Sequence, residues 1–354
     1  MLLGIYVAGL VEMHIVFVHL NTPLPNHLKW NLHAASEQFP HYQIVLIHNK
    51  EVSPRKSHLP KNCIQFEYKL ENRFTVLDSL YSHPKKFRGN FWLTSTARFF
   101  ALEQYVKKVN EEVIHLESDV IISNDFPFKA FAKLDQGLAF PIISKERGVG
   151  SVIYIRDSDS ATLLTSNILK EASLNSQTTE MLMLKKLLDS EGNKIAQLPI
   201  GPPFKVGYNE TSFSYLDGQF TTFGILGGIF DGVDIGQYFI GTDPKNRRGR
   251  VLIREDLVKG FAKIKNWHIK YNEERQFIDL FLEDKEYLSP IYALHVAVKV
   301  EKYFNLNKRG IALRRAVERQ NLGAGSYISP KVFVRSVLDS AKRRSQRFFT
   351  RSLN

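Results

Sequence analysis

HIVFVHL, from His14 to Leu20, and QIVLIH, from Gln43 to His48, are two short apolar runs that each predict a buried strand. Between them, residues 26–39 carry Leu28 and Leu32 at the spacing of a helix with one apolar face. A strand, a helix and another strand in this order are typical of a parallel sheet with helices packed on it. The start of the chain therefore predicts an α/β fold.

The alternation of strands and helices continues along the chain. Further helices are predicted over residues 92–109, 158–171 and 178–188. Further strands are predicted over residues 113–116, 120–122, 138–142, 151–155, 262–267 and 291–296. No internal repeat or low-complexity linker divides them, so we expect one catalytic domain over residues 1–326, followed by a separate tail over residues 327–354.

The net charge of the chain is strongly positive, since 48 Lys and Arg stand against 36 Asp and Glu. Such an excess favours a polyanionic partner: nucleic acid, an anionic membrane or a phosphate-bearing substrate. The tail over 327–354 intersperses basic and apolar residues, as does a basic amphipathic helix on an anionic membrane. A solvated tail is the alternative. No nucleic-acid module is recognisable, so we expect no nucleic-acid partner.

The cysteine content and the apolar runs bear on the compartment. The single cysteine, Cys63, allows no intramolecular disulfide, which fits a reducing compartment. No run reaches the ~18 apolar residues of a membrane-spanning helix, and residues 1–11 lack the basic start of a signal peptide. We therefore expect a cytoplasmic protein, either free or peripheral on the inner face of the membrane.

The residues that carry chemistry lie in HLESDVII, from His115 to Ile122. An apolar strand ends there in Glu117 and Asp119, and a second apolar run follows. In an extended backbone, residues i and i+2 point to the same side, so we expect both carboxylates to face one ligand. Paired carboxylates at the end of a parallel strand suit Mg²⁺ or Mn²⁺ bound to a nucleotide diphosphate.

Two carboxylates at this spacing are also common by chance. Asp157 and Asp159 repeat the spacing, and we interpret them as a helix start with Asp157 or Ser158 as the N-cap. Glu117 and Asp119 differ because they interrupt apolar strands. This context favours a ligand-binding role for them.

Separated blocks of sequence extend the motif. FWLTSTARFF, from Phe91 to Phe100, precedes HLESDV; FDGVDIGQY, from Phe230 to Tyr238, is followed by GTDPKN; and LHVAVK ends at Lys299. In this order the blocks resemble GT-A glycosyltransferases of the bacterial capsular and surface polysaccharide kind. The resemblance covers parts of residues 91–299. It implies a Rossmann-type mixed sheet flanked by helices. It also implies transfer of a sugar from a nucleotide diphosphate sugar to a hydroxyl of a glycan acceptor, free or lipid-linked.

The resemblance further implies roles for individual residues. The ligands of a divalent cation, Mn²⁺ or Mg²⁺, would be Glu117, Asp119 and His295. The residues that bind the nucleotide-sugar would be Arg98, Glu117, Asp119 and Lys299. The catalytic residues would be Glu180, near the transferred sugar, and Asp231, in contact with substrate hydroxyls.

The side chains outside the Glu117 and Asp119 pair also have structural interpretations. These are a core histidine for His295, a surface-covering stem for Arg98, a solvated lysine at a strand end for Lys299, an exposed helix residue for Glu180 and an N-cap for Asp231. The final block departs from the family pattern, because Ala297 and Val298 stand where a histidine and a serine are usual. His295 is then the one candidate metal ligand of that block.

Two other functions stay open. A sugar nucleotidylyltransferase uses a related sheet, but it needs a Gly-x-Gly-x-Arg loop after the first strand, and residues 20–25 are LNTPLP. A non-catalytic glycan-binding protein would keep the fold without turnover. Absence of metal binding would favour this second alternative.

Overall fold

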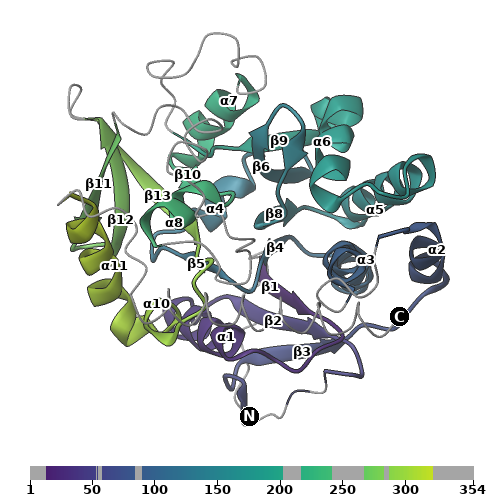
Figure 1. Cartoon of the computed structure of the whole chain (residues 1–354), viewed down its shortest axis with the longest axis horizontal. Coiled ribbons are helices and arrows are strands. Elements are labelled where there is room, and N and C mark those ends of the chain that lie inside the picture. The colour runs from purple at the N-terminus through teal and green to yellow at the C-terminus, as the bar shows by residue number, and fades with distance from the viewer. Residues whose placement is uncertain are drawn as a thin grey trace, which may run out of the picture.

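The computed structural model describes residues 13–52, 54, 58–83, 90–201, 217–240, 267–282 and 287–321. Three features expected from the sequence fall outside these residues: most of the strand over 262–267, the GTDPKN block and the tail over 327–354. The described part forms two sheets with helices packed against them (Figure 1).

The larger sheet is built on four parallel strands: β1 (His14–His19), β2 (Gln43–His48), β3 (Cys63–Glu67) and β4 (Val113–Leu116). It continues in antiparallel pairs through β8 (Val152–Ile155), β6 (Leu138–Ser144) and β7 (Arg147–Gly148), while β9 (Ile195–Leu198) pairs parallel to β6. The strand order is β3-β2-β1-β4-β8-β6-β7. The expected mixed α/β sheet is therefore confirmed, and β2 and β4 have the predicted bounds.

Helices cover both faces of this sheet because its central strands are apolar on both sides. In β1, Ile15 and Phe17 belong to one core and Val16 to the other, and all three are buried. The first core includes α1 (Asn26–Gln38) and α4 (Phe128–Phe131). The second includes α2 (Asn72–Leu80), α3 (Phe91–Val109), α5 (Ser158–Leu174) and α6 (Glu180–Glu191) (Figure 1).

A smaller sheet lies beside the first, and β13 (Tyr287–His295) is its central strand (Figure 1). Its other strands are β5 (Val120–Ile122), β10 (Ile229–Phe230), β11 (Trp267–Asn272) and β12 (Phe277–Leu282). β13 pairs antiparallel with β5, which follows β4 along the chain. This pairing brings the end of β13 to the end of β4.

A third apolar core packs helices on the smaller sheet. They are α7 (Asp217–Leu226), α8 (Asp234–Phe239), α10 (Glu301–Phe304) and α11 (Leu306–Asn321). Ile235 of α8 and Leu294 of β13 are both buried in this core. The start of α8 is thereby held against the end of β13.

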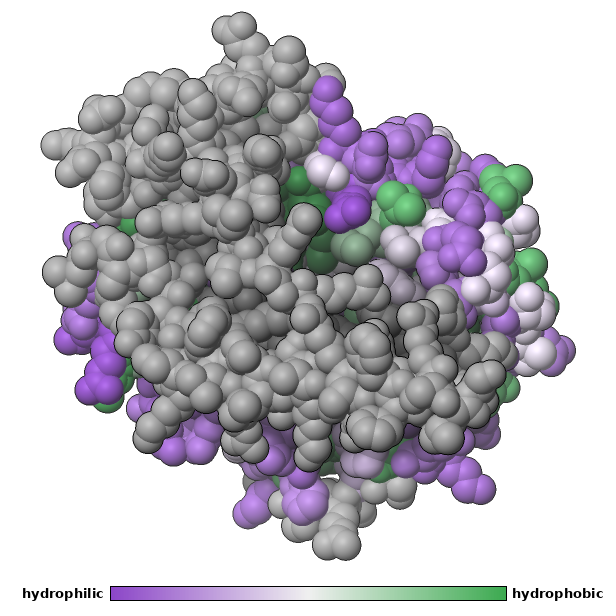
Figure 2. All heavy atoms as spheres, in the orientation of Figure 1, coloured by the Kyte–Doolittle hydropathy of each residue, from purple (hydrophilic) through white to green (hydrophobic). Residues whose placement is uncertain are grey.

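The outer surface over α2, α5 and α6 is mostly hydrophilic, and Figure 2 shows hydrophobic residues there only as separate spots. Val76 of α2 and Leu174 of α5 are among the exposed large hydrophobic residues of this layer. Within the described ranges, no helix is long and apolar enough to cross a bilayer.

Candidate active site

The two carboxylates of the HLESDVII motif lie in a tight turn between β4 and β5. The N–H of Val120 donates to the carbonyl of Glu117 at 3.0 Å, which closes the turn. The extended backbone expected for Glu117 to Asp119 was therefore wrong, and the turn brings the carboxylates together instead. Asn31 of α1 holds the turn, because its side-chain amide donates to the carbonyl of Val120 at 2.7 Å.

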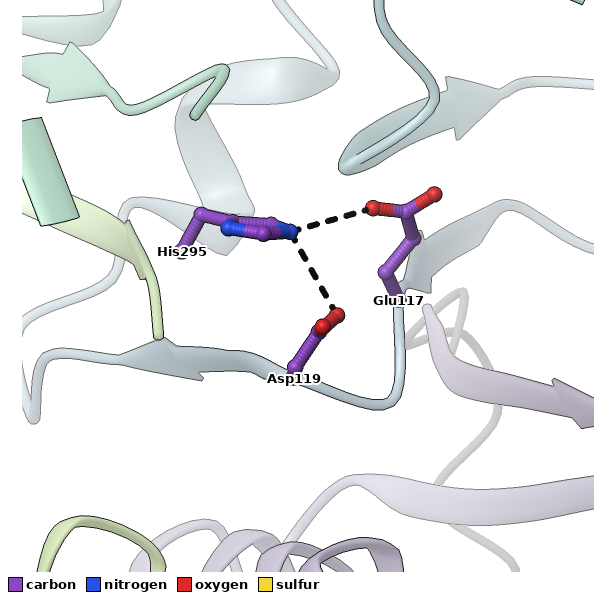
Figure 3. Close-up of side chains that lie close together, drawn as sticks. All are labelled: Glu117, Asp119 and His295. Carbon is purple, nitrogen blue, oxygen red and sulfur yellow. Dashed lines mark ion pairs between the residues drawn. The ribbon is translucent and has the colours of Figure 1, made fainter. Parts of the chain in front are cut away.

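His295 reaches this turn from the end of β13. It pairs with Val120 in the ladder between β5 and β13, and the N–H of Val296 donates to the carbonyl of Asp119 at 2.7 Å. The Nε2 atom of His295 lies 3.5 Å from Oδ1 of Asp119 and 3.7 Å from Oε2 of Glu117 (Figure 3). One ligand atom from each of the three residues lies within 4.8 Å of the others.

Each carboxylate of this group also faces a cation with its second oxygen. Arg98 of α3 donates through one terminal nitrogen to Oε1 of Glu117. Lys299 lies with its Nζ 3.1 Å from Oδ2 of Asp119. The oxygens Oε2 of Glu117 and Oδ1 of Asp119 are thereby turned toward His295.

The three ligand atoms suit a divalent cation. With metal–oxygen distances of about 2.1 Å, neighbouring ligands of an octahedral ion lie about 3 Å apart and opposite ligands about 4 Å apart. The spacing of the ligand atoms of Glu117, Asp119 and His295 falls close to this range. Two carboxylate oxygens and one imidazole nitrogen are ligands that Mn²⁺ and Mg²⁺ accept, so the residues fit such an ion.

The electrostatics of the site keep Asp119 charged. Burial raises the pKa of Asp119, but the charges of His295 and Lys299 outweigh burial and hold this pKa at about 2. Arg98 is buried, which lowers its pKa, yet the charge of Glu117 beside it raises the pKa above the ordinary value. The carboxylates of Glu117 and Asp119 are therefore embedded among compensating charges.

Glu180, at the start of α6, joins the same charge network. Its Oε1 lies 3.2 Å from the second terminal nitrogen of Arg98. Glu180 is only 7 % exposed, and burial raises its pKa although Arg98 opposes the shift. Arg98 thus links the carboxylate of Glu117 to the more deeply buried carboxylate of Glu180.

These residues line one cavity of about 380 Å³ at the carboxyl ends of β1 and β4. Six of the residues predicted from the sequence line it: Arg98, Glu117, Asp119, Glu180, His295 and Lys299. The cavity continues along His19 at the end of β1, Thr22 after it, and Thr94 and Ser95 of α3. The topology thus brings residues from distant parts of the chain to one concave surface.

Asp231 lies outside the lining of this cavity and is 1 % exposed. Its carboxylate accepts backbone N–H groups from Ile235 at 3.0 Å and Gly236 at 2.8 Å, at the start of α8. It also accepts the backbone N–H of His295 at 3.1 Å. The N-cap residue of α8 is Val233, so Asp231 is not the N-cap expected from the sequence, but its carboxylate binds N–H groups of the first turn and ties α8 to His295.

The sequence reasoning missed His115 as a lining residue of the cavity. This histidine of β4 is 1 % exposed, and its Nδ1 lies 3.0 Å from the carbonyl oxygen of Val16. Burial, with the charge of Arg98, lowers its pKa to about 3. The signal in the sequence was a histidine inside an apolar strand, two residues before Glu117.

No family model and no curated protein matches the sequence. Several solved structures are similar to the chain in part. One is the galactosyltransferase LgtC with donor and acceptor sugar analogs, at 13 % identity, with a TM-score of 0.37, covering 53 % of this chain and 73 % of that one. An active-site mutant of LgtC gives 13 % identity, 70 % and 94 % coverage, and a TM-score of 0.40.

Mouse xyloside xylosyltransferase 1, in its apo form, is also similar, at 10 % identity, with a TM-score of 0.38, covering 53 % of this chain and 86 % of that one. These proteins are glycosyltransferases by name. Because identities and scores at this level carry no functional argument, the assignment of function rests on the residues of the cavity.

Proposed function

We propose that this protein is a metal-dependent glycosyltransferase that moves a sugar from a nucleotide diphosphate sugar to a hydroxyl of a glycan acceptor. The observation that carries the proposal is the meeting of Glu117, Asp119 and His295 within 4.8 Å of one another. They meet on the wall of a cavity that also contains the cations Arg98 and Lys299. A divalent cation held by these three residues, together with the two basic side chains, would stabilise the negative charge of a departing diphosphate.

In this proposal Glu117, Asp119 and His295 hold Mn²⁺ or Mg²⁺. The ion, when bound, supplies positive charge that stabilises the leaving diphosphate. Lys299 is 41 % exposed at its side chain and borders the cavity, so its ammonium can contact a phosphate oxygen. Arg98 positions Glu117 and adds positive charge beside this carboxylate, as Lys299 does beside Asp119.

Glu180 is the residue that we propose to contact the transferred sugar. Its Oε1 faces Arg98, and Glu180 is one of the residues that line the cavity. A buried carboxylate there can orient a sugar hydroxyl or accept its proton. For Asp231 we propose a positioning role in place of substrate contact, since backbone N–H groups engage both of its oxygens.

The acceptor is proposed to be a glycan that is free or attached to a lipid. The basic tail over 327–354 supports the lipid-linked form, because its charge and apolar residues suit an anionic membrane surface. The tail lies outside the described residues, so this part of the proposal rests on sequence.

Calorimetry with Mn²⁺ and a panel of nucleoside diphosphates and nucleotide-sugars tests the proposed function. We expect binding of one nucleotide class that requires Mn²⁺ and that falls at least about tenfold in Asp119→Ala, the loss of one charged metal ligand being worth more than about 1.4 kcal/mol. Binding in the absence of metal, or no binding of any nucleotide by the folded protein, would overturn the proposal and favour a non-catalytic glycan-binding protein.

Asp159→Ala is the matched control. Asp157 and Asp159 have the same spacing as the metal-ligand pair, but Asp157 caps α5, with Oδ1 accepting the N–H of Ser160 at 2.8 Å, as expected from the sequence. Asp159 is exposed in the first turn of that helix. Nucleotide binding by Asp159→Ala should equal that of the wild type.

A further inference from the structure

The start of α8 forms one wall of the cavity. Val233, the N-cap residue of this helix, and Gln237, one turn later, both line the cavity. Gln237 is half-buried, so it keeps surface that a ligand in the cavity can contact. Within the described part of the chain, its side-chain amide forms no hydrogen bond. The amide is therefore available to a ligand.

The loop before β8 connects this wall to Arg98 and Glu180. A Cβ atom on Gly150 would collide with a terminal nitrogen of Arg98, the same nitrogen that lies 3.2 Å from Oε1 of Glu180. The next residue, Ser151, donates through its hydroxyl to the carbonyl of Asp231 at 3.3 Å, shortly before α8 begins. The start of α8 therefore lies close to the place where Arg98 meets Glu180.

The chemistry of the α8 wall selects the kind of group that binds there. Its two lining residues, Val233 and Gln237, are uncharged. A phosphate makes its strong hydrogen bonds to charged donors, so this wall offers little to a phosphate. A sugar suits it better, because the C–H face of the ring can pack on the valine. A hydroxyl of the sugar can also exchange a hydrogen bond with the amide, which both donates and accepts.

We propose that Gln237 is a specificity-determining residue whose side-chain amide forms a hydrogen bond with a hydroxyl of the transferred sugar. The inference rests on the proposed function, in which Glu180 contacts the same sugar. A nucleotide-sugar carries its sugar and its nucleoside at opposite ends of the diphosphate. With the sugar beside Glu180 and α8, the nucleoside lies away from this wall. The amide of Gln237 then distinguishes a nucleotide-sugar from the corresponding nucleoside diphosphate.

The substitution Gln237→Met tests this contact. Methionine has nearly the length of glutamine and is a good helix former, so α8 should be kept while the donor and the acceptor are lost. Gln65→Met is the matched control, because Gln65 is also half-buried but lies in β3, outside the lining of the cavity. Thermal unfolding checks that both variants fold. Calorimetry with Mn²⁺ then measures the Kd of UDP, GDP and ADP and of sugars linked to them.

We expect Gln237→Met to weaken binding of the nucleotide-sugar by about three- to tenfold, the usual worth of one neutral hydrogen bond, and to leave binding of the nucleoside diphosphate unchanged. Gln65→Met should change neither Kd. Equal losses for both ligands in Gln237→Met would overturn the inference alone, because a nucleoside contact or a displaced His295 predicts them. No loss for either ligand would also overturn it. If the wild type binds no nucleotide at all, the proposed function fails, and the inference fails with it.

Discussion

Arg98 holds two carboxylates at once. One terminal nitrogen donates to Glu117, and the other lies 3.2 Å from Glu180. A planar guanidinium serves two acceptors in fixed directions, whereas a lysine ammonium is a compact charge on a flexible stem. The guanidinium therefore determines where both carboxylates lie in the cavity.

We expect Arg98→Lys to lower the free energy of unfolding by about 1–3 kcal/mol, because one ammonium cannot satisfy both buried carboxylates. Added Mn²⁺ should recover part of this loss, since a divalent cation beside Glu117 replaces missing positive charge. Urea unfolding of wild type and variant, with and without MnCl₂, measures both effects. A loss of the same size in both conditions would mean that Arg98 and the metal group act independently.

Helix α8 contacts β13 through a glycine. A Cβ atom on Gly236 would lie 1.6 Å from the carbonyl oxygen of His295, and backbone atoms cannot move aside as a flexible side chain can. Asp231 binds the N–H groups of both residues from the other direction. The helix and the strand can therefore approach this closely only when residue 236 is glycine.

We expect Gly236→Ala to destabilise the protein by about 1–3 kcal/mol through overpacking and to weaken Mn²⁺-dependent nucleotide binding, since His295 must move. Gly224→Ala is the control, because a Cβ at this position, near the end of α7, would meet no other described part of the chain within 4 Å. It should be neutral or stabilise by up to about 1 kcal/mol. Chemical unfolding and calorimetry measure both variants, and an unaffected nucleotide Kd in Gly236→Ala would contradict the role given to this contact.

Helix α3 is tied to its neighbours by Glu103. The carboxylate accepts from Arg73 of α2 at 2.7 Å, from Lys107 at 2.7 Å and from Thr162 of α5 at 3.2 Å. Burial raises the pKa of Glu103, but hydrogen bonds from Lys107 and Thr165 and the charges of Arg73 and Lys107 outweigh burial and lower the pKa below its ordinary value of 4.5. The charged form is therefore the one that stabilises the helix layer.

Glu103→Gln should destabilise the protein by about 1–3 kcal/mol at pH 7, the worth of hydrogen bonds to a charged group. Since the pKa of Glu103 is lower in the folded state, the unfolded state binds more protons in acid. The contribution of the Glu103 carboxylate to the free energy of unfolding is therefore complete above pH 4.5. It is lost as the pH falls through the folded-state pKa. Urea unfolding from pH 7 to pH 3 should show the curves of wild type and variant converging, and a constant separation would contradict this account.

The molecule as a whole assembles the cavity between two sheets. Glu117 follows β4 of the larger sheet, whereas His295 ends β13 of the smaller one. The tail over 327–354 adds a second feature, with seven Lys and Arg against Asp339 alone. We propose that the domain binds the nucleotide-sugar and that the tail binds the membrane.

Removal of residues 327–354 should therefore reduce binding to phosphatidylserine vesicles by more than tenfold at low salt, because each basic residue near such a surface contributes about 1 kcal/mol. Binding of the nucleotide should remain as in the full chain. Vesicle sedimentation measures the first and calorimetry the second, with neutral phosphatidylcholine vesicles as control. Equal vesicle binding by both chains would reject the membrane role of the tail.

Local patterns predicted the elements that are apolar and regular. β2 and β4 have the expected bounds, and α1 and α3 each differ by one residue at one end. β3 and α2 were missed because their patterns are weak: β3 is only partly buried, and in α2 the one buried residue is Leu77. Apolar residues recur at regular spacing only where one face of an element is buried. An edge strand or a helix with few buried residues therefore shows a weak pattern in the sequence.

The sequence was sufficient to predict an α/β sheet and to single out Glu117 and Asp119, because an apolar strand interrupted by carboxylates is a local pattern. The tertiary structure alone brought His295 to within 3.5 Å of Asp119 and turned the carboxylate of Asp231 toward backbone N–H groups. It also brought His115 into the wall of the cavity. These arrangements depend on the pairing of β5 with β13, and no periodicity within one segment encodes which distant strand will be its neighbour.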